Sequence, residues 1–171
     1  MKKRLIIPIL IAASLLAGYY IHDALYYKDE VPFASPLNAD VVKLRYDKFG
    51  DGHFAAKRKN DRAHTGIDIL AERGEPVVAA KSGWAKSKFD LDGYGNYVVI
   101  RHKDGYTSRY GHLESANMRW IKKVKQGDVI GWAGCTGNAR CEGMRSHLHF
   151  EIRKDGVPVD PGACLKEPIV K

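Results

Sequence analysis

Histidines and acidic residues at particular spacings are the side chains of this sequence that could do chemistry. The segment Ser-His-Leu-His-Phe-Glu-Ile places His147, His149 and Glu151 at alternate positions. On a β-strand alternate side chains share a face, so both imidazoles would point the same way while the aliphatic residues between them are buried. Such a pair can bind a metal ion, a proton or a substrate. The other interpretation is a strand whose histidines are exposed and have no task.

A second pair of such residues lies earlier, in the segment His-Thr-Gly-Ile-Asp. Gly66 and its β-branched neighbours favour a strand there, so His64 and Asp68 would face the same side. Alone, Asp68 could equally be a surface carboxylate and His64 a polar residue at a strand end. Combined with the C-terminal histidines, this pair supplies imidazole nitrogens and a carboxylate oxygen. These are the ligands of a four-coordinate zinc ion that keeps one position open for catalysis.

Other common metal and hydrolase motifs do not occur in the sequence. There is no His-Glu-x-x-His helix and no Gly-x-Ser-x-Gly motif of a serine hydrolase. The cysteines Cys135, Cys141 and Cys164 do not have the spacing of a zinc knuckle. In an exported protein one disulfide is expected among them, and the short segment between Cys135 and Cys141 favours that pair, although all three pairings are open. His53 and His102 lie beside Asp-Gly turns and are expected to be solvated.

Short apolar runs predict the elements that would position these residues. The chain of 171 residues has room for one domain, and its 44% hydrophobic and 28% charged residues are ordinary globular usage. The runs recur between turn signals, which is typical of antiparallel β-structure. We therefore predict a mainly β, single-domain fold with one brief helix at 114–118. The predicted strands cover residues 41–45, 66–70, 76–80, 83–89, 96–102, 106–112, 120–124, 129–133 and 147–153.

The N-terminus has the character of an export segment. Three basic residues precede the uncharged stretch 5–22. No clean small-residue cleavage site follows, so residues 1–22 are either a signal peptide or an uncleaved anchor. The uncharged stretch 5–22 is near the lower limit of about 17 residues for spanning a bilayer. Tyr19 stands where a lipoprotein would need cysteine, which excludes lipid attachment there. Residues 23–33 are predicted to be a linker.

The net charge gives some indication of partners. It is +8 for the whole chain, and +5 without residues 1–20, which hold three basic and no acidic residues. In an exported protein, a moderately basic domain suits anionic cell-wall or membrane surfaces. No zinc-finger, helix-turn-helix or aromatic nucleic-acid motif occurs, so nucleic acid is not an expected partner. Solvated surface lysines explain most of the charge.

Taken in order, these motifs resemble the lysostaphin-type zinc metallopeptidases, the peptidoglycan endopeptidase family. The family motifs are His-x-x-x-Asp, Tyr-x-His-Leu and His-x-His, and this sequence carries them at 64–68, 110–113 and 147–149. An ordered set of motifs is more specific than any one of them. The resemblance implies a metallopeptidase domain at 34–163, followed by a C-terminal tail at 164–171.

Carried over position by position, the resemblance implies that His64, Asp68 and His149 bind one zinc ion. His112 and His147 would form the catalytic pair beside the metal. One of them would take a proton from water and pass it to the leaving amine, and the other would hydrogen-bond the developing oxyanion, in an order left open. The implied fold is a curved antiparallel sheet forming a groove, with zinc on its floor and loops walling its ends. Residues 135–146 depart from the family's short Gly/Ser-rich loop.

The function implied by the resemblance is zinc-dependent hydrolysis of peptide stems or cross-links of peptidoglycan. The protein would act in the periplasm or at the cell surface, as a secreted or membrane-anchored monomer. A pentaglycine bridge and a D-alanyl to diaminopimelate bond both lie within the family's range. The alternative is a non-catalytic zinc-binding or regulatory module of the same fold that binds cell wall or activates another hydrolase. Such relatives usually lack a ligand or a catalytic histidine, whereas this sequence has all five positions.

Overall fold

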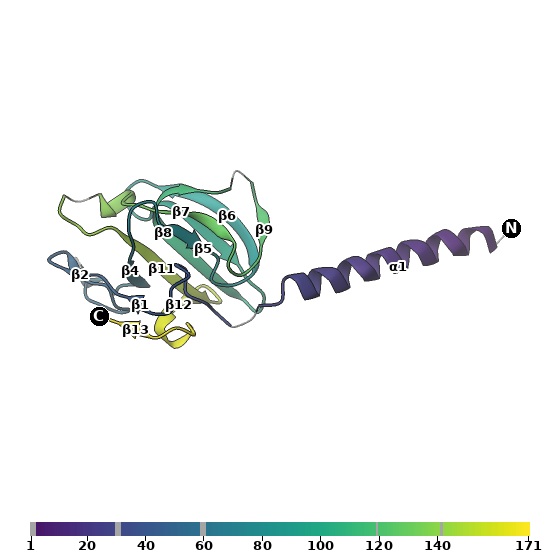
Figure 1. The fold of residues 1–171 in the computed structure, drawn as a ribbon, viewed down its shortest axis with the longest axis horizontal. Coiled ribbons are helices and arrows are strands. Elements are labelled where there is room, and N and C mark those ends of the chain that lie inside the picture. Colours follow the sequence, from purple (N-terminus) through teal and green to yellow (C-terminus); the bar gives the residue numbers. More distant parts are fainter. Residues whose placement is uncertain (1–2, 30–31, 59–60, 119, 141) are drawn as a thin grey trace.

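The computed structural model describes the whole chain except residues 1–2, 30–31, 59–60, 119 and 141. Figure 1 shows a β domain with the N-terminal helix running away from it, while the C-terminus lies beside the domain at β13. The helix is α1 (Lys3–Tyr26), and the 3-10 helices η2 (Gly137–Ala139) and η3 (Pro161–Ala163) lie in loops. The strands are β1 (Val42–Lys43), β2 (Tyr46–Asp47), β3 (Gly50–Asp51), β4 (Ile67–Leu70), β5 (Pro76–Val78), β6 (Gly83–Asp90), β7 (Gly95–Arg101), β8 (Tyr106–Ala116), β9 (Lys122–Val124), β10 (Val129–Ala133), β11 (His147–Lys154), β12 (Val157–Val159) and β13 (Ile169–Val170).

One antiparallel sheet forms the body of the domain, and in the described part of the chain it has nine strands. The path β12-β11-β8-β7-β6-β9 runs across it, while β4 pairs with β11, and β10 pairs with both β8 and β5. Two smaller pairs accompany it, the parallel pair of β1 with β13 and the antiparallel pair of β2 with β3. These strands confirm the prediction of a mainly β, single-domain fold with antiparallel pairing.

The alternation of apolar and polar residues explains why one face of the sheet is buried. Leu148, Phe150 and Ile152 of β11 have no exposed surface and join a core that includes Ile67 and Ile100. The residues between them point to the opposite face, because the side chains of a strand alternate. A single strand therefore supplies a packing face and a face that is free to carry chemistry.

The helix predicted at 114–118 is wrong. β8 continues through Ala116, and Ser115 and Ala116 pair with Trp132 and Gly131 of β10. The neighbouring strand supplies hydrogen-bond partners for this segment, whereas an isolated helix of five residues is marginal in water. A Cβ on Gly131 would lie 2.6 Å from the Ser115 carbonyl oxygen, so glycine permits the close pairing.

β8 contains a bulge beside the predicted site histidines. The pairing of β8 with β7 shifts register between Asn96 and Val98 of β7. His112 has a φ of 63°, in the left-handed region that is uncommon for residues other than glycine, and its N–H donates to the Tyr94 carbonyl oxygen at 2.7 Å. A bulge bends the strand and re-aims a side chain. The direction of the His112 imidazole is therefore set by this bulge and not by the regular pleat.

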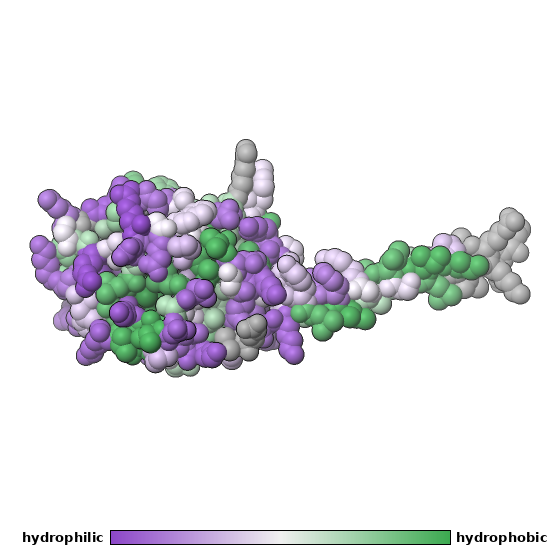
Figure 2. All heavy atoms as spheres, in the orientation of Figure 1, coloured by the Kyte–Doolittle hydropathy of each residue, from purple (hydrophilic) through white to green (hydrophobic). Residues whose placement is uncertain are grey.

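α1 contains a candidate membrane span. Its residues Ile7–Tyr26 are long and apolar enough to cross a bilayer, and none of this span is buried. Figure 2 shows hydrophobic side chains along the helix, apart from the domain, whose surface mixes hydrophilic and hydrophobic residues. A signal sequence has the same character, so both predictions for residues 1–22 stay open. The helix ends at Tyr26, inside the range 23–33 predicted as a linker.

The junction between α1 and the domain is held by charged contacts. Asp29 accepts a hydrogen bond from Lys81 Nζ at 2.8 Å. Asp23 forms an ion pair with Lys123, whose ammonium also lies 4.1 Å from the ring centre of Tyr27. The segment between the apolar helix and the domain is therefore docked on the domain surface.

The range predicted as a C-terminal tail, 164–171, also packs on the domain. It contains β13, in which Ile169 lies opposite Val42 of β1. The Lys166 N–H donates to the Phe33 carbonyl oxygen at 3.0 Å, and Phe33 itself is buried. The two ends of the predicted 34–163 domain are therefore tied together by residues just outside it.

The disulfide prediction is only partly covered by the structure. Cys135 and Cys164 are free cysteines, so they are not joined to each other. Cys141 lies outside the described residues. Because Cys135 is free, the structure does not show the preferred pair of Cys135 with Cys141.

His102 differs from the solvated residue expected beside a turn. Its Nδ1 lies 2.9 Å from the Ser82 carbonyl oxygen, and its Nε2 lies 2.8 Å from Ser108 Oγ. A carbonyl oxygen only accepts, so Nδ1 carries the proton and Nε2 is the acceptor of a neutral ring. Burial lowers the pKa of His102 from 6.5 to about 4.

This lowered pKa makes the stability of the domain depend on pH. Between about 6.5 and about 4 the unfolded chain takes up a proton at His102 that the folded chain resists, so the free energy of unfolding falls as the pH drops through this window. The full difference corresponds to at most about 3 kcal/mol. Denaturant unfolding of the full chain in uncharged detergent, at several pH values, should show a shallower pH dependence for His102→Gln than for the wild type. His53→Gln, which changes an exposed histidine, is the control, and equal slopes for all three proteins would contradict the assignment.

Candidate metal centre

Two paired strands bring the three predicted zinc ligands together. In the register of β4 with β11, Asp68 lies directly opposite His149, and His64 stands in the loop that leads into β4. His64 Nε2, Asp68 Oδ1 and His149 Nδ1 lie 2.9–3.1 Å from one another. All three residues are buried. The structure thus gathers residues that are up to 85 positions apart in the chain.

This triangle of donor atoms fits one zinc ion. Zinc binds imidazole nitrogen and carboxylate oxygen at about 2.0–2.2 Å, so neighbouring ligand atoms of a tetrahedral site are about 3.3 Å apart. The observed spacings of 2.9–3.1 Å are close to that value. Two nitrogens and one oxygen form one face of the tetrahedron and leave the fourth corner free, which is the pattern of catalytic rather than structural zinc sites.

His64 is oriented by the backbone on its far side. Its Nδ1 lies 2.8 Å from the His53 carbonyl oxygen. Because a carbonyl only accepts, Nδ1 carries the proton and Nε2 keeps its lone pair toward the other two ligands. Gly66 allows β4 and β11 to approach here, since a Cβ at that position would lie 2.3 Å from the Phe150 carbonyl oxygen. This contact gives the glycine of the His-Thr-Gly-Ile-Asp segment its physical reason.

Two arginines hold the outer oxygen of Asp68. Arg45 and Arg58 donate to Oδ2 at 3.0 and 2.9 Å, which leaves Oδ1 facing the histidines. Burial by itself raises the pKa of Asp68, but its contacts with the His149 and His64 rings hold it well below its ordinary value. The carboxylate is therefore ionised at neutral pH, as a metal ligand must be. Sequence reasoning missed both arginines, because no local spacing connects them with Asp68.

Glu151 orients His149 in the same way. Its Oε1 lies 3.2 Å from His149 Nε2, so the Nε2–H donates to the carboxylate and Nδ1 is left for the metal. Tyr94 donates to Oε1 at 2.6 Å and Arg153 Nε donates to Oε2 at 2.8 Å, while the Thr65 hydroxyl donates to Oε1 as well. The strand alternation placed Glu151 on the histidine face, but its contact with His149 becomes visible only in the structure.

The electrostatics of the centre favour a cation. Burial lowers the pKa of His149, but hydrogen bonds and charges of Asp68 and Glu151 raise it to about 9. Burial raises the pKa of Glu151, yet the hydrogen bond from His149 holds it well below its ordinary value. Two buried carboxylates therefore stabilise positive charge at the His149 ring. A divalent metal ion at Nδ1 meets the same electrostatic demand and replaces a proton there.

His112 and His147 lie beside this group. Their ring centres are 5.0 Å apart, and that of His112 is 5.7 Å from that of His149. Each Nδ1 donates to a backbone carbonyl, of Thr136 at 3.0 Å and of Arg145 at 2.8 Å, so each ring keeps Nε2 as an acceptor. Burial lowers the pKa of both rings, that of His112 to about 3. Both are therefore neutral near pH 7, with an unprotonated Nε2.

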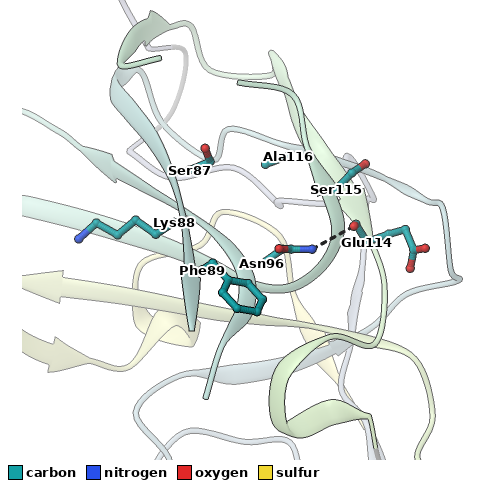
Figure 3. Close-up of a pocket in the computed structure, with 7 residues that line it drawn as sticks. All are labelled: Ser87, Lys88, Phe89, Asn96, Glu114, Ser115 and Ala116. Atoms are coloured by element: carbon teal, nitrogen blue, oxygen red, sulfur yellow. Dashed lines mark hydrogen bonds between the residues drawn. The ribbon is translucent and has the colours of Figure 1, made fainter. Parts of the chain in front are cut away.

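A separate open hollow lies elsewhere on the domain (Figure 3). Its lining comes from β6, β7 and β8, and one hydrogen bond crosses it, from Asn96 Nδ2 to the Glu114 carbonyl oxygen at 3.1 Å. None of the five predicted site residues lines this hollow. The side chains drawn there bring no set of metal ligands together, so the chemistry of the chain centres on the histidine group. The lining residues are Ser87, Lys88, Phe89, Asn96, Glu114, Ser115 and Ala116.

Comparison with known families decides the classification of this domain. Peptidase family M23 matches residues 62–161, which is more than half of the chain. The chain belongs to peptidase family M23. The matched range contains His64, Asp68, His112, His147 and His149, and the zinc dependence of M23 peptidases agrees with the donor set described above.

A solved structure of an M23 peptidase shows the same fold. The catalytic domain of lysostaphin from Staphylococcus simulans is 29% identical in sequence and gives a TM-score of 0.57. The similarity covers 71% of this chain and 90% of that domain. The resemblance to the lysostaphin-type metallopeptidases is thereby confirmed.

The curated relatives of this domain include proteins named as peptidases and proteins named as activators of murein hydrolases. The DD-carboxypeptidase/endopeptidase Mpg of Neisseria meningitidis serogroup B is 46% identical over 100 residues, which are 58% of this chain and 22% of the relative. The lipoprotein NlpD/LppB homolog of Pseudomonas aeruginosa is 42% identical over 113 residues, 64% of this chain and 35% of the relative. The murein hydrolase activator NlpD of Salmonella typhimurium is 36% identical over 103 residues, 60% and 26% of the two chains. This chain thus spans about a third or less of the relatives that it matches.

The contacts of Glu151 predict its effect on metal binding. Removing the carboxylate in Glu151→Ala frees the His149 ring to turn and leaves Arg153 without its partner, so the zinc affinity should fall about 10- to 100-fold. Titration of the full chain in uncharged detergent against a zinc-selective chelator measures this change. Glu142→Ala removes an exposed glutamate and should keep the wild-type affinity. Equal zinc affinities of Glu151→Ala and the wild type would show that the ring does not depend on this contact.

Proposed function

We propose that the chain is a zinc-dependent endopeptidase that hydrolyses the peptide stems or cross-links of peptidoglycan. In this proposal His64, Asp68 and His149 bind one zinc ion, and His112 and His147 are the catalytic residues. The observation that carries the proposal is the group of three buried donor atoms with two neutral histidines beside it.

The chemistry divides between the metal and the two histidines. A bound Zn²⁺ supplies Lewis acidity, which makes water nucleophilic near neutral pH and polarises a peptide carbonyl. His112 and His147 present their Nε2 atoms as acceptors, because each Nδ1–H is committed to a backbone carbonyl. Their lowered pKa values keep them unprotonated until a proton is released by the attacking water. One histidine would accept that proton and pass it to the leaving amine, so the proton count balances within this step. The other could hydrogen-bond the oxyanion only with an Nε2–H, which it would take from solvent before the reaction.

The rigid arrangement of the two histidines supports this division of roles. His112 is aimed by the bulge of β8, and His147 by its bond to the Arg145 carbonyl oxygen two residues earlier. Neither ring is a member of the donor group of the metal. Both can therefore contact substrate while the three ligands keep the zinc ion in place.

Peptidoglycan as the substrate is supported by the family and by the relatives. Mpg carries the name DD-carboxypeptidase/endopeptidase, and lysostaphin is an antimicrobial peptidase. An envelope location is supported by the same relatives, one of which is named a lipoprotein, and by the apolar α1. We propose that α1 exports the domain and anchors it on the outer side of the cytoplasmic membrane, where a peptidoglycan peptidase meets its substrate.

A second candidate function is activation of another murein hydrolase. It is favoured by the relatives named murein hydrolase activator, which match the same domain. In an activator the histidine group would serve folding or partner binding and no bond would be cut. The complete set of ligands and neutral histidines favours the peptidase over this alternative.

Two substitutions in the centre separate metal binding from catalysis. His149→Ala removes a ligand, so zinc content and cleavage of purified sacculi should both be lost. His112→Ala removes a proton acceptor outside the donor group, so one zinc ion per chain should remain while cleavage falls by about 100-fold or more. Metal content by elemental analysis and released fragments by mass spectrometry provide both readouts on the full chain in uncharged detergent. His53→Ala is the control, because its side chain is exposed and only its backbone carbonyl contacts His64.

The same experiment tests the proposal against its alternative. Loss of zinc from His112→Ala would move that residue from catalysis to metal binding. One zinc ion in a wild-type chain that cuts no sacculi, but increases the rate of an added murein hydrolase, would replace the peptidase proposal with the activator. The masses of released fragments would also identify the bond that is cut.

A further inference from the structure

The sheet face that carries the metal group continues away from it across three more strands. Residues that lie directly opposite each other in paired strands share a face. Glu151 of β11 lies opposite Arg109 of β8, which lies opposite Val99 of β7, which in turn lies opposite Lys86 of β6. This row therefore stays on one face and leads from Glu151, which contacts His149, across the sheet to strand β6.

Two further rows run parallel to this one. The row on one side crosses β11, β8, β7 and β6. Its successive partners are Arg153, Thr107, Arg101 and Trp84. On the other side, Tyr97 lies opposite Lys88, and the ring centres of Tyr97 and Tyr94 are 5.0 Å apart. We call the outer part of this face the cationic face, and define it by four exposed residues and the half-buried Tyr97. The exposed residues are Trp84, Lys86, Lys88 and Arg101.

The cations of this face have no partner among the described residues. Lys86, Lys88 and Arg101 are exposed and occur in none of the ion pairs found in the described part of the chain. Closer to the metal group, Arg109 and Arg153 share one buried carboxylate, Glu151. The sheet face that carries the centre therefore has an excess of positive charge on its outer strands.

The acidic groups around the face do not neutralise it. Asp90 lies at the end of β6, where its carboxylate packs against the turn at Gly93. Asp23 is engaged by Lys123, the residue of β9 opposite Trp84. Positive charge that remains unpaired beside a catalytic centre attracts anionic substrates and raises their local concentration.

We propose that the cationic face binds the carboxylate groups of a peptidoglycan stem peptide and so selects acidic stems over neutral glycine bridges. This proposal rests on the proposed function, because it assigns the substrate of the same centre. Stem peptides carry free carboxylates on their glutamate, diaminopimelate and terminal alanine residues, whereas a glycine bridge has no charged side chain. Lys86, Lys88 and Arg101 are the specificity-determining residues, and Trp84 and Tyr97 offer flat surfaces for the backbone between the charges.

The dimensions of the sheet agree with such a substrate. Neighbouring strands lie about 4.8 Å apart, so the three steps from β11 to β6 span roughly 14 Å. An extended peptide covers about 3.4 Å per residue, so about four residues reach from the metal group to Lys86. A stem peptide is short, so its carboxylates lie within about four residues of the scissile bond. This matches the reach from the metal group to Lys86.

The test compares an acidic substrate with its neutral form. The substrates are a synthetic cross-linked stem dimer with free carboxylates and the same dimer with carboxamides in their place. The variant Lys86→Gln/Lys88→Gln/Arg101→Gln removes three charges from the cationic face. Lys43→Gln/Lys103→Gln/Lys166→Gln is the matched control, since it removes three exposed charges elsewhere. For the zinc-loaded full chain in uncharged detergent, the face variant should raise KM for the acidic dimer at least tenfold and leave kcat within about twofold. KM for the neutral dimer should not change.

Binding is measured separately so that the two proposals can fail independently. Calorimetric titration of the acidic dimer into His112→Ala chains, with and without the face substitutions, gives Kd without turnover. A tenfold weaker Kd caused by the face variant alone supports the cationic face even if the wild type cuts nothing, in which case only the proposed function fails. A variant with Lys86→Arg, Lys88→Arg and Arg101→Lys keeps the charge and should keep the wild-type Kd.

Three outcomes would overturn the inference. The first is an unchanged Kd and KM in the face variant while the wild type cleaves stems. The second is equal affinity of the wild type for acidic and neutral dimers. The third is binding to vesicles of anionic phospholipid that depends on Lys86, Lys88 and Arg101, without any binding of the acidic dimer. That result would assign the face to a membrane surface.

Discussion

The antiparallel pairing of β4 with β11 is the constraint on which the rest of the site depends. It places Asp68 opposite His149, and through the preceding loop it brings His64 to the same point. A slip of one residue would turn Asp68 toward the core and a leucine or isoleucine toward the metal position. The register is held by the core itself, because Ile67 and Ile69 are buried against the same layer as Leu148 and Phe150.

Burial of so many polar groups is tolerated because each of them has a partner on its outer side. Backbone carbonyls, two arginines and Glu151 take up the nitrogen or oxygen atom that each ligand turns away from the centre. Unpaired polar groups in this position would cost several kilocalories per mole in total. The same contacts fix the tautomers of the rings, so the network that makes burial tolerable also aims the lone pairs at one point.

Local order in the sequence predicted nine of the strand segments and proposed the candidate residues, whereas β2, β3, β12 and β13 were not predicted. Period-two alternation predicts β11, and the motif order assigns His64, Asp68 and His149 to one metal. Spacing could not reveal Arg45 and Arg58, which reach Asp68 only through tertiary packing. The short helix predicted at 114–118 was wrong for the same reason, since pairing with β10 is a contact between distant segments. The burial of His102 likewise depends on Ser82, which is 20 residues away.

His112 shows how non-local contacts hold a candidate catalytic residue in place. Its left-handed φ costs roughly 1 to 3 kcal/mol for a residue with a side chain, so surrounding contacts must hold it. The hydrogen bond from its N–H to Tyr94 and the bond from its ring to Thr136 come from two separate loops. Gly111 beside it leaves room for Tyr94, because a Cβ there would lie 3.2 Å from that ring. The backbone strain is thus supported by the same tyrosine that donates to Glu151, which couples the aim of His112 to the orientation of His149.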